Sequence, residues 1–169
     1  MSNIYRYYVE GECEAKFINT FKTGKNPKFI SGKVEVFNIN TEKITPMRLI
    51  NMSRNTTIIL IYDTDKPCSD IFDLNIKQLK ENKNISNIIH VQSVANFEDE
   101  IVRHSNISSI NDFFHTEGIK NFKHKFVISS IEKRFSTIDF DFSKVWTSKP
   151  TDASYSKYKN SSNKIKIKK

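Results

Sequence analysis

Apolar positions in the first 93 residues form short runs that alternate with stretches of helical spacing. The apolar runs, typical of buried parallel strands, predict four strands at 4–9, 33–39, 57–62 and 85–91. Helical spacing and capping residues predict helices at 12–22, 45–52 and from 69 or 70 to about 83. The last helix should bury Ile71, Leu74, Ile76 and Leu79. This alternation indicates an α/β fold, with a mostly parallel four-stranded sheet flanked by helices.

After residue 93 the pattern becomes helical. It predicts helices at 95–104, 109–115 and 118–135, is ambiguous at 139–146, and has almost no large aliphatic residue from 148 onward. A length of 169 residues fits one domain. We therefore expect an α/β core over 1–93, a helical extension over 94–147 that completes the same domain, and a mobile lysine-rich tail over 148–169.

The net charge of +8 is concentrated in that last segment. Residues 144–169 hold eight lysines and one acid, Asp152, whereas the first 143 residues hold 19 basic and 18 acidic residues. Such a tail can bind a polyanion through counterion release, or it can simply be solvated.

The rest of the composition bears on location. Without a long apolar stretch or a basic-then-apolar leader, the chain should be soluble and cytoplasmic, with no membrane partner. The two cysteines, Cys13 and Cys68, fit reduced thiols better than a disulfide.

Carboxylates follow two of the predicted strands. Glu10 follows the strand at 4–9, and Asp63 and Asp65 follow the strand at 57–62. Ligands of open α/β sheets bind beyond the carboxyl ends of the strands, so these three acids should surround one cavity. Asp63 and Asp65 should point the same way, because side chains two apart in an extended segment share a face. Close carboxylates repel unless a cation neutralises them, and oxygen ligands favour Mg²⁺ or Mn²⁺, so we predict a divalent-metal site for phosphate chemistry.

Two neighbouring residues could add to this site. Glu14 lies one helical turn beyond Glu10 and could approach the same cavity, or it could be a solvated helix position. Lys66 could contact a phosphate, or it could be a solvated loop lysine. In phosphodiester hydrolysis, one or two such ions activate a water and neutralise the leaving oxygen.

These motifs resemble a known family. Val9-Glu10-Gly11-Glu12, followed some fifty residues later by Asp63-Thr64-Asp65, resembles the Toprim domain of topoisomerases, bacterial primases, overcoming-lysogenization-defect (OLD) nucleases and small maturation ribonucleases. The segment from Val9 to Glu14 is most similar to the OLD-type and RloB-like Toprim nucleases of bacterial defence loci. The segment from Ser93 to Glu100 is similar to a Ser-x-x-x-Phe-Glu stretch found there. The resemblance covers about residues 4–104.

The resemblance implies a Rossmann-like sheet and a site. Glu10 would lie near the scissile phosphate as a metal ligand or general acid/base, and Asp63 and Asp65 would hold Mg²⁺. Glu98 could complete a second metal position, or it could be a surface acid of an amphipathic helix. The implied activity is a Mg²⁺-dependent nuclease cleaving DNA or RNA in antiviral defence. OLD proteins carry an ATPase domain that this chain lacks, so a separate ATPase could be a partner; a homo-oligomer is also open.

Other interpretations compete with the nuclease. Asp63-Thr64-Asp65 also resembles the nucleophile loop of haloacid-dehalogenase-type phosphatases, although that motif normally follows the first strand. A P-loop is excluded, because Gly24-Lys25 has Asn19 where the earlier glycine is needed and Asn26 where Ser or Thr is needed. The alternative from a different class is a non-catalytic nucleic-acid-binding or protein-interaction module with a Toprim-like fold.

Overall fold

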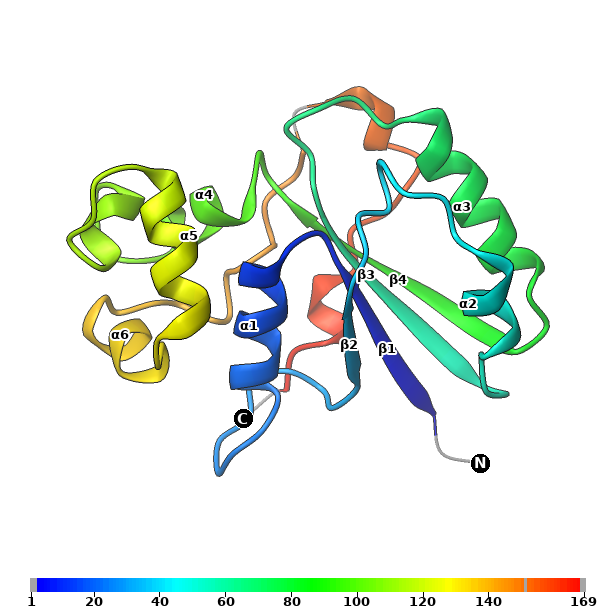
Figure 1. Ribbon diagram of the computed structural model, residues 1–169, viewed down its shortest axis with the longest axis horizontal. Coiled ribbons are helices and arrows are strands. Elements are labelled where there is room, and N and C mark those ends of the chain that lie inside the picture. The colour runs from blue at the N-terminus through cyan, green and yellow to red at the C-terminus, as the bar shows by residue number, and fades with distance from the viewer. Residues whose placement is uncertain (1–2, 151, 168–169) are drawn as a thin grey trace.

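A computed structural model describes residues 3–150 and 152–167 of the protein. Its four strands form one sheet in which every neighbouring pair is parallel and the order is β2-β1-β3-β4 (Figure 1). The strands are β1 (Ile4–Val9), β2 (Lys33–Val36), β3 (Thr56–Asp63) and β4 (Ile85–Ser93). The predicted parallel four-stranded sheet is therefore confirmed, with β1 and β3 as its central strands.

The helices follow the predicted order. They are α1 (Glu12–Phe21), α2 (Pro46–Ile50), α3 (Asp70–Glu81), α4 (Phe97–Arg103), α5 (Ile119–Ile128) and α6 (Glu132–Thr137), with 3₁₀ turns η1 (Ile110–Phe113), η2 (Ala153–Tyr155) and η3 (Ser162–Lys164). The single helix predicted over 118–135 is in fact two, because Ser129 adopts an extended backbone between α5 and α6. Among the helices that the structure describes, none is long and apolar enough to cross a membrane.

Alternate residues of the central strands pack into two separate hydrophobic cores, one on each face of the sheet. Tyr7 and Val9 of β1 pack into the core beneath α1 and the helical extension, whereas Tyr8 packs into the core beneath α2 and α3. Figure 1 shows α1 and the extension on one side of the sheet and α2 and α3 on the other. Because β1 and β3 are covered on both faces, they read as near-continuous apolar runs.

The buried face of α3 differs from the predicted one. Leu74 is 41% exposed, whereas Phe72, Asn75, Ile76 and Leu79 are buried. Asn75 is a polar residue on this face because its amide donates to the carbonyls of Ile39 and Glu42, and its oxygen accepts from the backbone N–H of Ile44. Hydrogen bonding to the β2–α2 loop, together with the burial of Phe72, Ile76 and Leu79, therefore sets the rotation of this helix.

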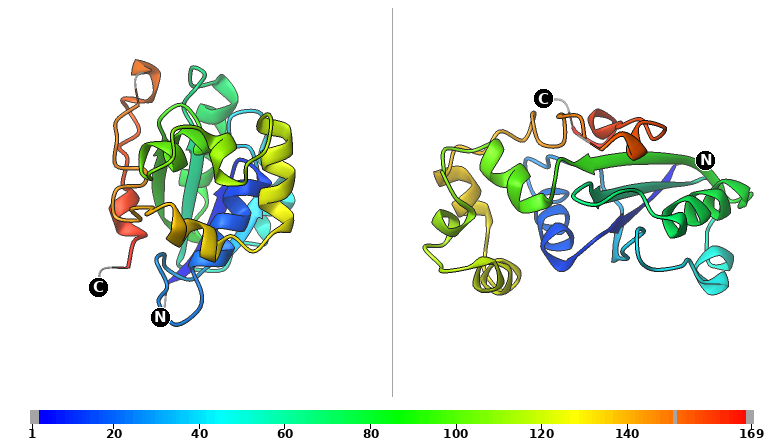
Figure 2. Two further views of the ribbon diagram at one scale, coloured as in Figure 1. Left: turned by 90° about the vertical axis from the view of Figure 1, so that its left-hand side faces the viewer. Right: turned by 90° about the horizontal axis from the view of Figure 1, so that it is seen from above.

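The C-terminal segment packs on the sheet instead of forming the predicted mobile tail. Its described part runs alongside β4 (Figure 2), with Asn160 bridging to His90. Tyr155 is 2% exposed in the core beneath α3, and Ile165 is buried in the opposite core. These two apolar anchors hold a segment whose composition suggested only solvation; residues 151, 168 and 169 lie outside the described residues.

Candidate acidic site at the carboxyl end of the sheet

Glu10 joins the ends of the two central strands. It directly follows β1, and its Oε2 accepts a hydrogen bond of 3.0 Å from the backbone N–H of Asp63 at the end of β3. Its Oε1 accepts one of 2.8 Å from the side-chain amide of Asn38. Burial raises the pKa of Glu10, while these two hydrogen bonds act to lower it. The carboxylate is thus held in one orientation at the carboxyl edge of the sheet.

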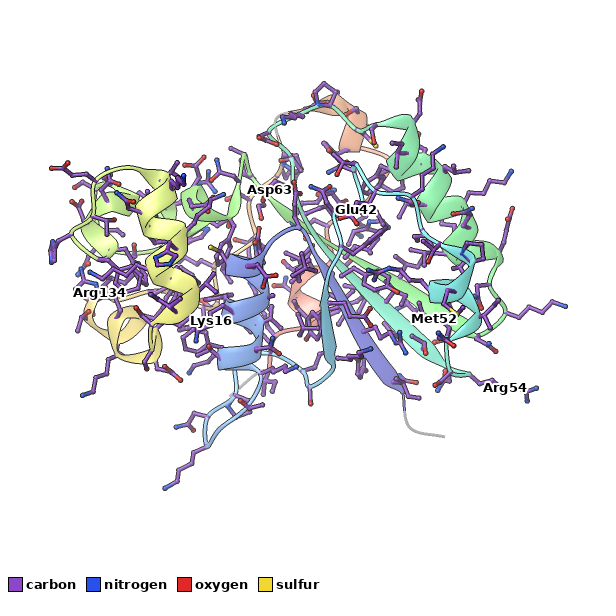
Figure 3. All side chains as sticks on the ribbon, viewed as in Figure 1. Lys16, Glu42, Met52, Arg54, Asp63 and Arg134 are labelled. Atoms are coloured by element: carbon purple, nitrogen blue, oxygen red, sulfur yellow. The ribbon has the colours of Figure 1, made fainter. Side chains whose placement is uncertain are left out.

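Asp63 lies at the centre of the acidic site. It is the last residue of β3, pairs with Ser93 of β4, and lies at the end of the sheet nearest the start of α1 (Figure 3). Burial, followed by the nearby charges of Glu14, Glu10 and Glu98, raises the pKa of Asp63 to about 9. Its Oδ1 is buried and has no hydrogen-bond partner within the described residues. A buried carboxyl with an unsatisfied oxygen is costly, so this site is arranged for something other than stability alone.

Two further acids close around Asp63 from helices. Glu14, in the first turn of α1, is 6% exposed, and Glu98, in the first turn of α4, is 7% exposed. Burial, followed by the charges of Glu98 and Glu10, raises the pKa of Glu14 to about 7. A Cβ at Gly11 would lie 3.1 Å from Oε2 of Glu14, so the small residue leaves room for this carboxyl. The structure therefore buries both residues near Asp63 rather than leaving them in solvent.

Asp65 and Lys66 lie at the rim of the acidic site. Both are exposed in the loop after β3. The charge of Asp65 raises the pKa of Glu10 and that of Lys66 lowers it, so both lie on the Glu10 side. Asp63 is partly buried, and the charges of Glu14, Glu10 and Glu98 act to raise its pKa, so Glu10 lies near both aspartates. That the two aspartates share a direction stays a prediction. The strand ends at Asp63, and the two-residue periodicity ends with it.

Thr64, to which the sequence assigned no role, links the loop after β3 to the end of β4 and the loop that follows it. Its backbone N–H donates to the carbonyl of Ala95 at 2.9 Å, and its Oγ1 donates to the carbonyl of Ser93 at 2.7 Å. Ala95 has a φ of 62°, a left-handed conformation that is strained for a residue with a Cβ. The loop that leads to Glu98 is thereby bent back against the end of β3.

Lys123 of α5 is the second residue that the motifs did not indicate. Its Nζ lies 3.2 Å from Oε1 of Glu98. Burial lowers the pKa of Lys123, but the charge and hydrogen bond of Glu98 outweigh this effect and the pKa is raised. The available signal was a run of basic residues on a predicted helix. Lys123 partly neutralises Glu98, and its charge also acts to lower the pKa of Glu14.

The chemistry of the donors fits a hard cation. The acidic site offers carboxylate oxygens from β3, α1, α4 and the β1–α1 junction, including the unpartnered Oδ1 of Asp63. Oxygen ligands of this kind suit Mg²⁺ or Mn²⁺. Within residues 3–150 and 152–167, no group of three or more His, Cys, Asp and Glu side chains is placed so that it could hold a metal ion.

The arrangement could act in two ways. Its acids could converge on a cation, or a carboxyl with a raised pKa could donate or accept a proton near neutral pH. Both actions suit a site at the carboxyl end of a parallel sheet. Comparison of the chain with protein-family models, with curated proteins and with solved structures found no match in any of the three.

Proposed function

We propose that the protein is a Mg²⁺-dependent nuclease of the Toprim type that cleaves phosphodiester bonds of DNA or RNA. The observation that carries this proposal is the convergence of Glu10, Glu14 and Glu98 on Asp63. Natural folds rarely bury several carboxyls together without a compensating charge, because each raises the cost of ionising the next. A divalent cation supplies that charge, and a phosphodiester is the substrate class whose hydrolysis such sites serve.

The residues of the acidic site would have different roles. Asp63, Glu10 and Glu14 would hold the cation, with Asp65 and Glu98 as further oxygen donors at its two sides. When bound, the ion would neutralise charge on the phosphate and lower the pKa of a water. Glu10, oriented by Asn38 and the Asp63 N–H, is held where it can accept a proton. Lys66 on the exposed rim is available to a phosphate oxygen of the substrate.

The order of the motifs supports the Toprim interpretation. The glutamate follows the first strand and the Asp-Thr-Asp segment follows the third, and these strands are neighbours in a parallel sheet. By the same resemblance, we propose that the nuclease acts in antiviral defence together with a separate ATPase subunit. An activity that needs such a subunit would be low for the isolated chain.

The direct test is cleavage of plasmid, single-stranded DNA and tRNA by the purified chain in Mg²⁺, in Mn²⁺ and in EDTA. We expect cleavage that requires the metal and falls by about 100-fold or more in Asp63→Asn. Asp99→Asn is the matched control, because Asp99 is an exposed acid next to Glu98 on α4.

Cleavage that persists in EDTA, or that Asp63→Asn and Asp99→Asn change equally, contradicts the proposal. Because a partner can gate activity, the same comparison is made in extracts of cells that express each variant during phage infection. A Mn²⁺ titration followed by electron paramagnetic resonance adds a readout that needs no substrate. Binding by the wild type and its loss in Asp63→Asn are expected.

A non-catalytic nucleic-acid-binding module is the second candidate, and the C-terminal segment favours it. Lys149, Lys159 and Lys164 are exposed there, although the segment itself is packed on the sheet. This function predicts salt-sensitive binding that survives Asp63→Asn and is lost when these three lysines become glutamine. The nuclease predicts that the glutamine variant keeps metal-dependent cleavage, with a raised KM.

A further inference from the structure

The helix α5 carries a concentration of positive charge, of which Lys123 is paired with Glu98 of the acidic site. From Gly118 to Ile131 there is no Asp or Glu, whereas Lys120, Lys123, His124 and Lys125 are all exposed. Phe122 and Phe126 on the opposite face of α5 are completely buried, so this helix cannot rotate without breaking the core. Lys120, Lys123, His124 and Val127 are spaced i, i+3, i+4 and i+7, which places them on one face. The basic face of α5 is therefore fixed in direction.

This basic face borders a hollow that begins at the acidic site. The hollow has a volume of about 350 Å³ and lies between the first turn of α1, residues 11–14, and α5. On the α5 side it is lined by Lys123, His124, Val127 and Ile128. Ile128 is 68% exposed, so it gives this hollow an accessible apolar wall. The volume falls in the range of small-molecule sites, about 300–1,000 Å³.

The lining separates by chemistry. Val127, Ile128 and Cys13 give an apolar surface, and Lys123 and His124 give a basic rim. Glu12, which is exposed, and the buried Glu14 lie on the α1 side, where the hollow meets the acidic site. An occupant must therefore place an apolar group against α5, place negative charge on the basic rim, and extend toward the acids.

We propose that this hollow holds one nucleotide of a single-stranded nucleic acid, whose backbone follows the basic face of α5 into the acidic site. The inference rests on the proposed nuclease function and names the form of its substrate. A sugar and base would cover Val127 and Ile128, and the phosphates would lie on Lys120, Lys123 and His124. A single strand is required because a duplex keeps its bases stacked inside, where they cannot enter a hollow between two helices.

The test measures binding without catalysis. Fluorescence anisotropy of a labelled oligothymidine is followed in EDTA over a range of salt concentrations. Lys120→Gln/Lys123→Gln should weaken binding about tenfold, and its plot of log affinity against log salt should be shallower by about 1.4, because each single-strand phosphate contact contributes about 0.7. Lys77→Gln/Lys80→Gln is the matched control: it removes the same charge from α3, on the other side of the sheet, and should leave both quantities nearly unchanged.

A second variant guards against misfolding, since Lys123→Gln also removes the partner of Glu98. Lys120→Gln alone keeps that ion pair and should show about half of the change in slope. No oligothymidine binding by the wild type, equal effects of the α5 and α3 variants, or tighter binding of duplex than of single strand would overturn the inference. If the α5 variants bind weakly but the wild type never cleaves, the proposed nuclease activity is contradicted and the proposed strand-binding surface is supported. If the wild type cleaves and the α5 variants bind normally, the nuclease activity is supported and the strand-binding surface is contradicted.

The apolar half of the hollow has its own test. The wild type should bind oligothymidine about fivefold more tightly than an abasic strand with the same number of phosphates, because a base covers apolar surface. Ile128→Ser should remove most of that preference while leaving the salt dependence unchanged. An Ile128→Ser protein with full preference for bases would place the nucleotide elsewhere.

Discussion

Two acids in neighbouring parts of the molecule, Glu100 and Asp63, have opposite surroundings: Glu100 is completely buried, and Asp63 is partly buried with one buried carboxyl oxygen. Glu100 on α4 is 0% exposed, and its Oε1 accepts from the N–H of Val94 at 3.0 Å and its Oε2 from the N–H of Trp146 at 2.8 Å. Arg103 also donates to it, at 2.5 Å. Asp63 has an unpartnered oxygen and faces other acids. Burial of an acid is therefore not in itself a sign of function; the sign is burial without partners.

The difference between these acids also separates their roles in the fold. Glu100 of α4 accepts hydrogen bonds from Val94, in the loop between β4 and α4, and from Trp146, in the segment that follows α6. It therefore links segments that are distant in the chain. Within the described residues the side chain of Asp63 makes no comparable set of hydrogen bonds, and the charges of Glu14, Glu10 and Glu98 act to raise its pKa. The contrast is tested by comparing how replacement of each acid changes the free energy of unfolding.

The largest expected effect is that of Glu100→Ala. It leaves two buried backbone N–H groups and a partly buried guanidinium without their acceptor, and each unsatisfied group costs about 1–3 kcal/mol. We expect the free energy of unfolding to fall by about 3–5 kcal/mol in urea denaturation. A loss below about 1 kcal/mol would mean that Glu100 is not the structural acid of the pair.

Asp63→Asn should instead raise the free energy of unfolding when divalent ions are absent. In the wild type at pH 8 the folded state keeps Asp63 protonated, because burial and the charges of Glu14, Glu10 and Glu98 raise its pKa to about 9, whereas the unfolded carboxyl is free to ionise. The amide has nearly the same shape and ionises in neither state, so this advantage of the unfolded state disappears. At pH 8 the free energy of unfolding should rise by an amount on the order of 2 kcal/mol, even though cleavage is lost. Unchanged or lower stability in EDTA, measured by the same urea denaturation, would remove the contrast with Glu100.

The third effect is a change in pH dependence. The folded-state pKa values of Asp63 and Glu14 are raised to about 9 and 7, whereas the unfolded carboxyls ionise near 4. Between these values the folded state binds more protons than the unfolded state, so stability without divalent ions should fall as pH rises from about 5 to 9. Mg²⁺ should reduce this fall, because it favours the ionised acids.

Glu14→Gln tests the contribution of Glu14 to this pH dependence, because its pKa lies in the lower part of the pH range. Its urea-denaturation midpoints should decline less between pH 5 and pH 8 than those of the wild type. Glu12→Gln is the control in the same helical turn, because Glu12 is exposed. If Glu12→Gln flattens the profile as much as Glu14→Gln, burial of Glu14 is not its cause.

Much of the α/β core could be read from short-range pattern. The apolar runs located all four strands within a few residues, and of the two expected capping residues of α3, Ser69 and Asp70, the structure has Ser69 at the cap. The placement of Glu10 and Asp63 at one edge also followed, because parallel neighbours end on the same side. The face of α3 did not follow, because Asn75 is buried through bonds to a loop some thirty residues away.

The sequence alone determined the alternation of strands and helices and the two acids that end adjacent strands, because both depend on residues within a few positions of one another. Only the tertiary structure decided that Glu14 and Glu98 close around Asp63, that Asp65 lies at the rim, and that the lysine-rich segment packs on the sheet. These outcomes depend on contacts between residues far apart in the chain, such as Thr64 with Ala95 and Lys123 with Glu98. No local periodicity encodes such contacts, because they form only when the packed core brings the segments together.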